Sequence, residues 1–332
     1  MTSSPTARAL ILLCSLVALG CRNEVSLGQP PGEPPPPSPT RSCVRAAEPG
    51  LFAEVSADYG PIRAMLGNPD DGVYVVAAPD GAPGTLLRAR EGRAEPMGMV
   101  GIGPAQMALG EHSIYVTCPQ SGQVFQLSLN QPKIESLAGQ ENVRAIAAGP
   151  SDIVYWALAT EKGSVRNYSF GSSPPQDLMS TPFPTSLAYD GTALFASGDG
   201  PIAVYDFSYY RRRGNLPGRC DGRMLVLTEW DILCADGGAI NQMARSGYNE
   251  VNTRATFPDA TVFDLVAGAG RVFFRLAPRD GKPESQRIMA MPIEGDAKPT
   301  VFATLPSGGQ SLAMDRCHLY ASSGSSIMRW PL

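Results

Sequence analysis

Residues 318–332 read HLYASSGSSIMRWPL, two short alternating apolar runs around a Ser/Gly turn. Such a pattern is typical of two antiparallel β-strands joined by a tight turn. A strand at the edge of a sheet carries unpaired N–H and C=O groups, so we expect another segment to cover this one. The same phrase occurs six more times upstream, and that repetition decides the fold.

Each copy of the phrase contains a second strand centred on one large apolar residue. These strands read VYVV, IYVT, VYWA, LFAS, ILCA, VFFR and LYAS, and their central anchor residues are Tyr74, Tyr115, Tyr155, Phe195, Leu233, Phe273 and Tyr320. Successive anchor residues are 41, 40, 40, 38, 40 and 47 residues apart. A period near 40 residues with several short strands per repeat is typical of β-propeller blades.

The flanking strands keep the same spacing. Each preceding strand places one apolar residue in a first-strand column, made of Met65, Met107, Ile146, Leu187, Leu225, Leu265 and Leu312. The third strands read LLRAR, VFQLSL, VRNYSF, IAVYDF, INQM, IMAMPI and IMRWPL, and weaker fourth strands include KIESLA, TRATFP and TVFATL. The sequence therefore predicts an all-β fold of seven four-stranded antiparallel blades. Six blades is the alternative, because repeat five lacks an aromatic anchor residue and repeat six carries the insertion RLAPRDGKPESQR (275–287).

The last repeat contains only three of the four strands. The segment LFAEVSAD (51–58) has the pattern of a fourth strand and stands just before the first strand of repeat one. We expect it to pair outside IMRWPL, which completes the last blade and closes the ring. The β-propeller domain is accordingly predicted to span residues 51–332.

Over about 280 residues this repeating pattern resembles the NHL, YVTN and gluconolactonase-like propeller superfamilies. The resemblance implies a propeller and brings no catalytic motif, because propellers serve unrelated functions. Propeller lyases and metal-dependent lactonases use His or carboxylate sets at the channel mouth, which the corresponding positions here lack. We therefore predict a non-catalytic protein without cofactor or bound metal. The alternative is a lactonase- or lyase-like enzyme with a metal at the mouth.

The predicted mouth is where the first strands begin. Ten or eleven residues before each anchor residue stand Arg63, Ala105, Arg144, Thr185, Arg223, Phe263 and Gln310. We predict an anionic ligand site formed by Arg63, Arg144 and Arg223 with Gln310, because the planar guanidinium suits carboxylate and phosphate. The alternative is that each arginine pairs with Asp264 or with a loop carboxylate. The two histidines, His112 and His318, fall in or next to first-to-second-strand turns on the opposite face and are interpreted as surface or packing residues.

The N-terminal 21 residues, MTSSPTARALILLCSLVALGC, are typical of an export signal, with Arg8 before a short apolar run. Ala18-Leu19-Gly20-Cys21 resembles the lipobox of bacterial lipoproteins, which implies a signal peptide over 1–20 and a lipidated Cys21. The linker 21–50 contains QPPGEPPPPSPT, which favours extended polyproline II. We expect a body tethered to the outer membrane, on its periplasmic or surface side.

Composition limits the class of partner. The chain has 332 residues, a net charge of −4, 43% hydrophobic and 17% charged residues, which is sufficient for a large core and gives no basic field for nucleic acid. We expect a monomer that binds an envelope protein or glycan. The basic stretch YYRRRGNLPGRC (209–220) is interpreted as a solvated outer strand, with a phosphate-rich lipid or glycan as the alternative.

Five cysteines follow Cys21, and an exported location permits disulfides. Cys220 and Cys234 stand at neighbouring ends of two predicted antiparallel strands, and we predict that they pair. A Cys43–Cys317 disulfide is predicted to lock the ring closure, which leaves Cys118 unpaired. No spacing among these cysteines indicates a zinc site.

Overall fold

The computed structural model describes residues 48–68, 72–137, 139, 142–169, 174–209, 211–219, 224–246, 251–279, 286–305, 309 and 311–332, without the side chains of 217–219. The chain divides into two units, 1–42 and 43–332, and all described residues belong to the second. The predicted signal peptide, Cys21 and the Pro-rich linker lie outside the described residues. No helix among the described residues is long and apolar enough to cross a bilayer.

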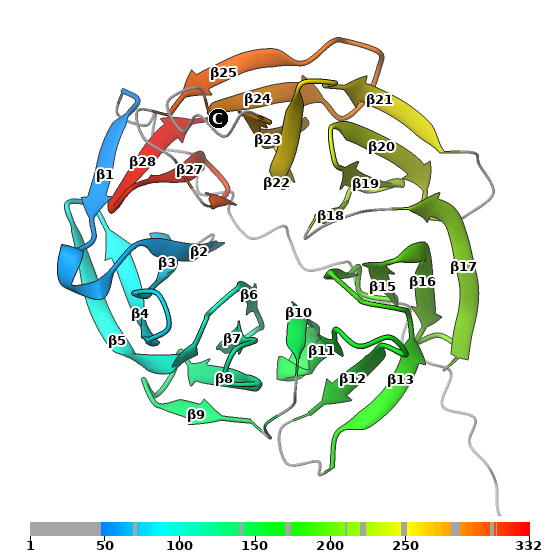
Figure 1. Ribbon diagram of the computed structural model, residues 1–332, viewed down its shortest axis with the longest axis horizontal. Helices are drawn as coiled ribbons and strands as arrows, with labels where there is room; N and C mark the ends of the chain where they lie inside the picture. Colours follow the sequence, from blue (N-terminus) through cyan, green and yellow to red (C-terminus); the bar gives the residue numbers. More distant parts are fainter. Residues whose placement is uncertain are drawn as a thin grey trace, which may run out of the picture. The chain divides into compact units, whose positions relative to one another are not determined.

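Seven four-stranded antiparallel sheets form a ring, which confirms the seven-bladed prediction and excludes six blades (Figure 1). Blades 1 and 2 consist of β2 (Ile62–Asn68), β3 (Gly72–Ala77), β4 (Pro83–Arg90) and β5 (Arg93–Ile102), then β6 (Gln106–Leu109), β7 (Ser113–Cys118), β8 (Gln123–Ser128) and β9 (Ile134–Ser136). Blades 3 and 4 consist of β10 (Val143–Ala148), β11 (Val154–Leu158), β12 (Ser164–Tyr168) and β13 (Gln176–Ser180), then β14 (Ser186–Tyr189), β15 (Ala193–Gly198), β16 (Gly200–Asp206) and β17 (Arg211–Arg219).

The remaining three blades complete the ring. Blades 5 and 6 consist of β18 (Leu225–Leu227), β19 (Asp231–Asp236), β20 (Ala239–Ala244) and β21 (Asn252–Thr256), then β22 (Ala260–Gly268), β23 (Arg271–Pro278), β24 (Arg287–Pro292) and β25 (Thr300–Thr304). Blade 7 contains β26 (Leu312–Met314), β27 (His318–Ser323), β28 (Ser326–Pro331) and β1 (Gly50–Glu54). The only helical segments in the described part are two three-residue 3-10 turns, η1 (Ala57–Tyr59) and η2 (Pro150–Asp152).

The seven anchor residues occupy the same place in every blade. Each lies on the second strand and is at most 2% exposed, as the repeat predicts. The clusters of buried apolar residues extend from one blade to the next, as when Tyr115 of blade 2 packs with Val154 and Trp156 of blade 3. Leu233 fills the aromatic position of blade 5 without breaking the ring, because packing there requires an apolar side chain and not an aromatic one.

The ring closes through the first described strand. β1 pairs antiparallel with β28, with Gly50 opposite Arg329 and Glu54 opposite Ser326, as predicted for the segment 51–58. The strand ends earlier than predicted, at Glu54, because Ser56 caps the 3-10 turn η1 with its side-chain hydroxyl. β1 therefore covers the edge that β28 would otherwise expose.

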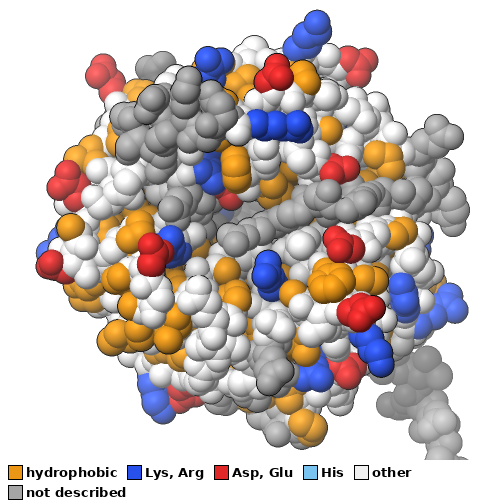
Figure 2. All heavy atoms as spheres, in the orientation of Figure 1, with side chains coloured by type: hydrophobic (Ala, Val, Ile, Leu, Met, Phe, Trp, Pro, Cys, Tyr) orange, Lys and Arg blue, Asp and Glu red, His pale blue; other side chains and the backbone are white. Residues whose placement is uncertain are grey.

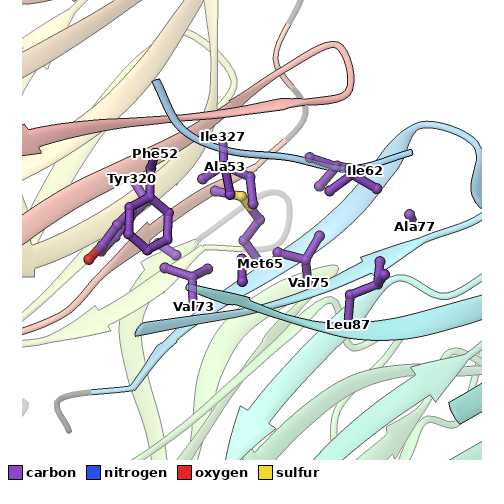
Figure 3. Packing of buried hydrophobic residues seen from close by; sticks show 13 residues of the cluster. Phe52, Ala53, Ile62, Met65, Val73, Val75, Ala77, Leu87, Tyr320 and Ile327 are labelled. Carbon is purple, nitrogen blue, oxygen red and sulfur yellow. The ribbon is translucent and has the colours of Figure 1, made fainter. Parts of the chain in front are cut away.

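The seam between blades 7 and 1 is closed by side chains as well as by backbone. Phe52 on β1 packs edge-on against Tyr320 with ring centroids 5.0 Å apart, and Arg329 lies over the Phe52 ring at 5.1 Å. Val73 and Val75 of blade 1 pack in the same cluster (Figure 3). One strand thus contributes to two blades, and its burial should carry much of the free energy of closure.

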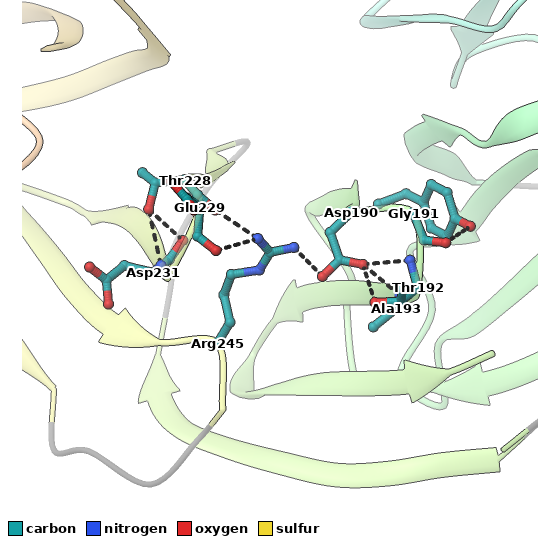
Figure 4. Close-up of polar contacts among 9 residues, drawn as sticks. Asp190, Gly191, Thr192, Ala193, Thr228, Glu229, Asp231 and Arg245 are labelled. Atoms are coloured by element: carbon teal, nitrogen blue, oxygen red, sulfur yellow. Dashed lines mark hydrogen bonds and ion pairs between the residues drawn. The ribbon is translucent and has the colours of Figure 1, made fainter. Parts of the chain in front are cut away.

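Blades 4 and 5 are joined by one arginine at the turns that follow their first strands. Arg245 donates from Nη1 to the carbonyl oxygens of Thr228 (2.8 Å) and Glu229 (2.9 Å) and from Nη2 to Asp190 Oδ2 (Figure 4). The other carboxylate oxygen, Asp190 Oδ1, accepts from the backbone N–H groups of Thr192 (2.8 Å) and Ala193 (2.6 Å). The Asp190 carboxylate therefore holds its own turn and the neighbouring blade.

The surroundings of Asp190 act on its pKa in opposite directions. Burial alone would raise the pKa, but the hydrogen bonds from the Thr192 and Ala193 N–H groups and from Arg245 outweigh it and hold the pKa below the ordinary value of 3.8. The carboxylate is therefore bound more favourably in the folded than in the unfolded protein. That contribution to stability is present above pH 3.8 and is lost as the pH falls through the folded pKa.

The described cysteines differ in state. Cys118 is a free, buried thiol whose pKa is raised by burial to about 12. Cys234 and Cys317 are disulfide-bonded. Their predicted partners, Cys220 and Cys43, lie outside the described residues, so the two pairings stay predictions.

We expect Phe52→Ala to lower the free energy of unfolding by about 3 kcal/mol, because it removes a buried ring from the closing seam. Phe52 is 5% exposed, whereas its neighbour Leu51 is 56% exposed, so Leu51→Ala is the matched control and should change stability little. Urea denaturation of both variants measures the difference. Equal destabilisation by the two substitutions would contradict the role of the seam.

We expect Asp190→Asn to destabilise the protein by about 2 kcal/mol at pH 7, because charge-assisted hydrogen bonds are lost. The difference from the wild type should shrink below pH 3.8, where the wild-type carboxylate itself takes up a proton. Asp58→Asn, an exposed change in η1, is the control. Chemical denaturation from pH 7 to pH 3 measures this dependence, and a pH-independent difference would show that Asp190 acts only through packing.

Candidate functional site: the channel and its mouth

The first strands of the seven blades surround a central channel. A cavity of about 220 Å³ is lined by residues of all seven, including the first-strand column residues Met65, Met107, Ile146, Leu187, Leu225, Leu265 and Leu312. The sequence repeat predicted this column. Column residues such as Met65, Ile146 and Leu187 pack in the apolar clusters of the blades, and the channel is also lined by polar side chains, among them Arg63, Gln106, Ser186, Asp264 and Ser311.

Neighbouring first strands are joined by polar side chains placed one residue before the column. Ser186 Oγ accepts the N–H of Leu225 (3.1 Å), and Ser311 Oγ accepts the N–H of Met65 (3.0 Å). Gln106 Oε1 accepts the N–H of Ile146 (3.3 Å) in the same way. Each of these hydrogen bonds joins the first strands of two adjacent blades. They therefore stabilise the channel wall.

The mouth opens beside the beginnings of the first strands. A cavity of about 410 Å³ is lined by Arg63, Ala105, Arg144 and Thr185, four of the seven residues in the predicted mouth column. The rest of the lining includes the β3–β4 loop and the β7–β8 loop. Arg63, Ala105 and Gln106 also line the channel, so the mouth leads into it.

The two arginines of the mouth are in different electrostatic states. Arg63 donates from Nε to the Ala78 carbonyl oxygen (3.0 Å) and forms an ion pair with Asp80, whose side chain is 97% exposed. Arg144 is exposed and forms no hydrogen bond or ion pair with any described residue. The alternative prediction, pairing with a loop carboxylate, therefore holds for Arg63, whereas no described carboxylate pairs with Arg144.

Asp264 has a partner other than a mouth arginine. It forms an ion pair with Arg275 of the same blade at 3.0 Å. Arg275 Nη1 also donates a hydrogen bond to Gln286 Oε1 (3.1 Å). The Arg275 guanidinium lies 5.1 Å from the ring centre of Phe263, which is the mouth-column residue of blade 6. Blade 6 thus supplies one partner for its own carboxylate.

Of the other residues singled out in the sequence, the structure describes some and not others. Arg223 and Gln310 lie outside the described residues, so their place at the mouth stays a prediction. The basic stretch forms the outermost strand β17 of blade 4, as expected, with Arg211, Arg212 and Arg213 exposed. His112 and His318 stand at first-to-second-strand turns, also as expected.

Charge is not concentrated in one place on the face seen in Figure 2, where acidic and basic side chains are interspersed. Among the residues that the structure describes, no group of three or more His, Cys, Asp or Glu is placed to hold a metal ion. The alternative of a lyase- or lactonase-like enzyme stays a prediction.

Three mouth residues escaped sequence reasoning because they stand in loops or serve several blades. Asp80 and Gln120 lie in the loops that follow β3 and β7, outside the strands that the repeat predicts. Gln106 bridges blades 2, 3 and 4, since its Nε2 also donates to the Thr185 carbonyl oxygen (3.1 Å). Its polar character next to an otherwise apolar column was the available signal.

No family model matches the chain, and no curated protein matches it in sequence. Its fold is similar to that of virginiamycin B lyase from Staphylococcus aureus, with a TM-score of 0.63, 12% identity, and 85% of this chain and 98% of that chain covered. A chain of a mitotic checkpoint complex has a TM-score of 0.64, 11% identity, and coverage of 87% and 95%. The extracellular domain of the putative one component system BT4673 from B. thetaiotaomicron has a TM-score of 0.62, 9% identity, and coverage of 86% and 40%. At these identities the likeness shows the propeller fold alone, and the neighbours differ in function.

Proposed function

We propose that this protein is a cell-envelope binding scaffold that holds an anionic group at the mouth of its propeller and performs no chemistry. One observation carries the proposal: Arg63 and Arg144, from blades 1 and 3, line one cavity, and the exposed Arg144 guanidinium has no partner among the described residues. An arginine with free donors suits the carboxylate or phosphate of a ligand.

The charge balance of the mouth cavity supports an anion. Its charged lining residues are Arg63, Arg144 and Asp80, which sum to one positive charge. Asp80 is almost fully exposed, and an ion pair of this kind contributes only about 0–1 kcal/mol. A ligand carboxylate can therefore replace Asp80 on Arg63 at little cost.

The size of the mouth limits how the ligand binds. A cavity of about 410 Å³ is within the range of small-molecule sites, roughly 300–1,000 Å³. It accepts an acidic side chain, a chain terminus or a charged sugar of an envelope protein or glycan, while the rest of such a partner lies across the rim. The first strands fix the backbone of both arginines, and the Arg63 guanidinium is also held by the Ala78 carbonyl oxygen and Asp80.

We also propose that a lipid on Cys21 tethers the body to the outer membrane through the Pro-rich linker. Ala18-Leu19-Gly20-Cys21 has the pattern of a lipoprotein processing site. Two or more acyl chains give stable membrane binding, whereas one chain gives only reversible binding. The compact unit that begins at residue 43 contains all seven blades, so the tether need not take part in the fold.

We expect Arg63→Ala/Arg144→Ala to weaken anion binding at least about tenfold, because hydrogen bonds to charged groups contribute about 1.5–3 kcal/mol each. Titration calorimetry on the body from residue 43 onward, with citrate and inorganic phosphate as probes, measures this. Arg211→Ala/Arg212→Ala removes the same charge from the outer strand β17 and is the matched control. The proposal fails if the wild type binds neither probe, or if the control loses as much affinity.

We expect Cys21→Ser to move the protein from the membrane fraction to the soluble fraction of cells that produce it, because the acylated sulfur is absent. Metabolic labelling with a radioactive fatty acid should mark the wild type and not the variant. Cys14→Ser, a change inside the expected signal peptide, should keep the label. A Cys21→Ser protein that still carries label would contradict the proposed tether.

A further inference from the structure

A second hollow lies on blade 2, away from the mouth. It has a volume of about 660 Å³, and its lining comes from the β6–β7 turn, β7, β8, the β8–β9 loop and β9 of blade 2 and from η2 of blade 3. We call it the blade 2 groove; it is lined by Glu111, His112, Ser113, Gln126, Ser128, Asn130, Gln131, Lys133, Glu135, Ser151 and Asp152. Every lining residue is polar or charged, which distinguishes this groove from the channel and the mouth.

The floor of the groove contains a buried amide. Gln126 is 9% exposed and donates from Nε2 to the hydroxyl of Ser113 at 2.9 Å. No described residue donates to Gln126 Oε1. This oxygen is not among the fully buried side-chain atoms that lack a partner, so it is accessible and can accept a hydrogen bond from a ligand or water.

The wall of the groove on the blade 3 side is held in an unusual backbone conformation. Ser151 and Asp152 are adjacent non-glycine residues with φ of 54° and 56°. Blade 2 fixes them, because Glu111 Oε2 accepts the Ser151 N–H (3.2 Å), Asp152 Oδ1 accepts the His112 N–H (2.9 Å), and the Tyr115 hydroxyl donates to the Asp152 carbonyl oxygen (2.8 Å). Left-handed conformations cost about 1–2 kcal/mol per residue, and such strain concentrates at functional sites.

The groove chemistry selects one class of ligand. Its charged residues are Glu111, Asp152, Glu135 and Lys133, three negative and one positive, so they sum to −2 and disfavour an anion. An apolar ligand would leave its polar lining unpaired. The amides of Gln126, Asn130 and Gln131 and three serine hydroxyls both donate and accept. A neutral molecule with many hydroxyl groups matches this set.

We propose that the blade 2 groove binds a short neutral oligosaccharide, as a second site independent of the anion site at the mouth. Its volume is within the roughly 300–1,000 Å³ of small-molecule sites. The carboxylates accept hydrogen bonds from sugar hydroxyls, and the amides both accept and donate. The bonds between blades 2 and 3 keep the wall in place before the ligand arrives.

The two histidines of the chain provide a local reporter. His112 lines the groove, whereas His318 lies on blade 7 beside Asp315 and Tyr320. Proton NMR of the full-length protein in detergent resolves the two imidazole signals, and His112→Gln assigns them. The probes are maltotriose, cellotriose and triacetylchitotriose, with inorganic phosphate as the anionic comparison.

We expect at least one of the three oligosaccharides to shift the His112 signal and leave that of His318 in place, with a dissociation constant of about 1 mM or tighter. Gln126→Leu should weaken binding at least about tenfold. Gln123→Leu changes the same residue type at the other end of β8, outside the groove lining, and should bind like the wild type. Arg63→Ala/Arg144→Ala should also bind like the wild type, which separates this site from the mouth.

The proposal is overturned if none of the three oligosaccharides shifts His112, if phosphate shifts it more strongly, or if a folded Gln126→Leu protein binds undiminished. Thermal unfolding reports whether that variant folds. If it does not, Asn130→Ala/Gln131→Ala replaces it, because both residues are exposed in the β8–β9 loop. That double variant should also weaken binding, by roughly fivefold, and undiminished binding would count equally against the site.

Discussion

The pairing of β1 with β28 is the constraint on which the rest of the structure depends. Each blade buries its apolar faces against the next blade, so an open ring would leave one face of blade 1 and one of blade 7 in water. β1 closes that gap with backbone hydrogen bonds and with Phe52, which packs against Tyr320 while Arg329 covers its ring. Closure also sets the radius at which the seven first strands meet. The channel, the mouth and the distance between their arginines follow from it.

Side-chain hydrogen bonds add further links between blades that are already packed through apolar residues. Serine hydroxyls of blades 4 and 7 and the amide of Gln106 link consecutive first strands at the channel wall. Arg245 and Asp190 link blades 4 and 5 farther along. Because these bonds use side chains and not extra backbone pairing, each blade keeps its four-stranded sheet. Loops and turns remain free to differ between blades, and both candidate sites lie at such places.

The sequence predicted the fold well because the propeller is periodic. Anchor residues near 40-residue spacing, the first-strand column and the orphan segment before Ile62 were sufficient to derive seven blades and their closure. Half of the mouth was predictable for the same reason, since Arg63 and Arg144 occupy equivalent positions of two repeats. The features that the sequence did not predict do not recur from one repeat to the next. The Arg245–Asp190 contact joins turns 55 residues apart, and the left-handed pair Ser151–Asp152 follows no composition rule.

The position of β1 in the chain has a mechanical consequence. β1 is the first described strand, so tension that reaches Gly50 from the N-terminal side acts on the closing seam. The seam resists it with the antiparallel backbone hydrogen bonds between β1 and β28 and with the packing of the Phe52 ring against Tyr320. A pull strong enough to peel β1 away would undo the circle itself and spread the two arginines of the mouth. The arrangement of the mouth residues therefore depends on the integrity of this strand.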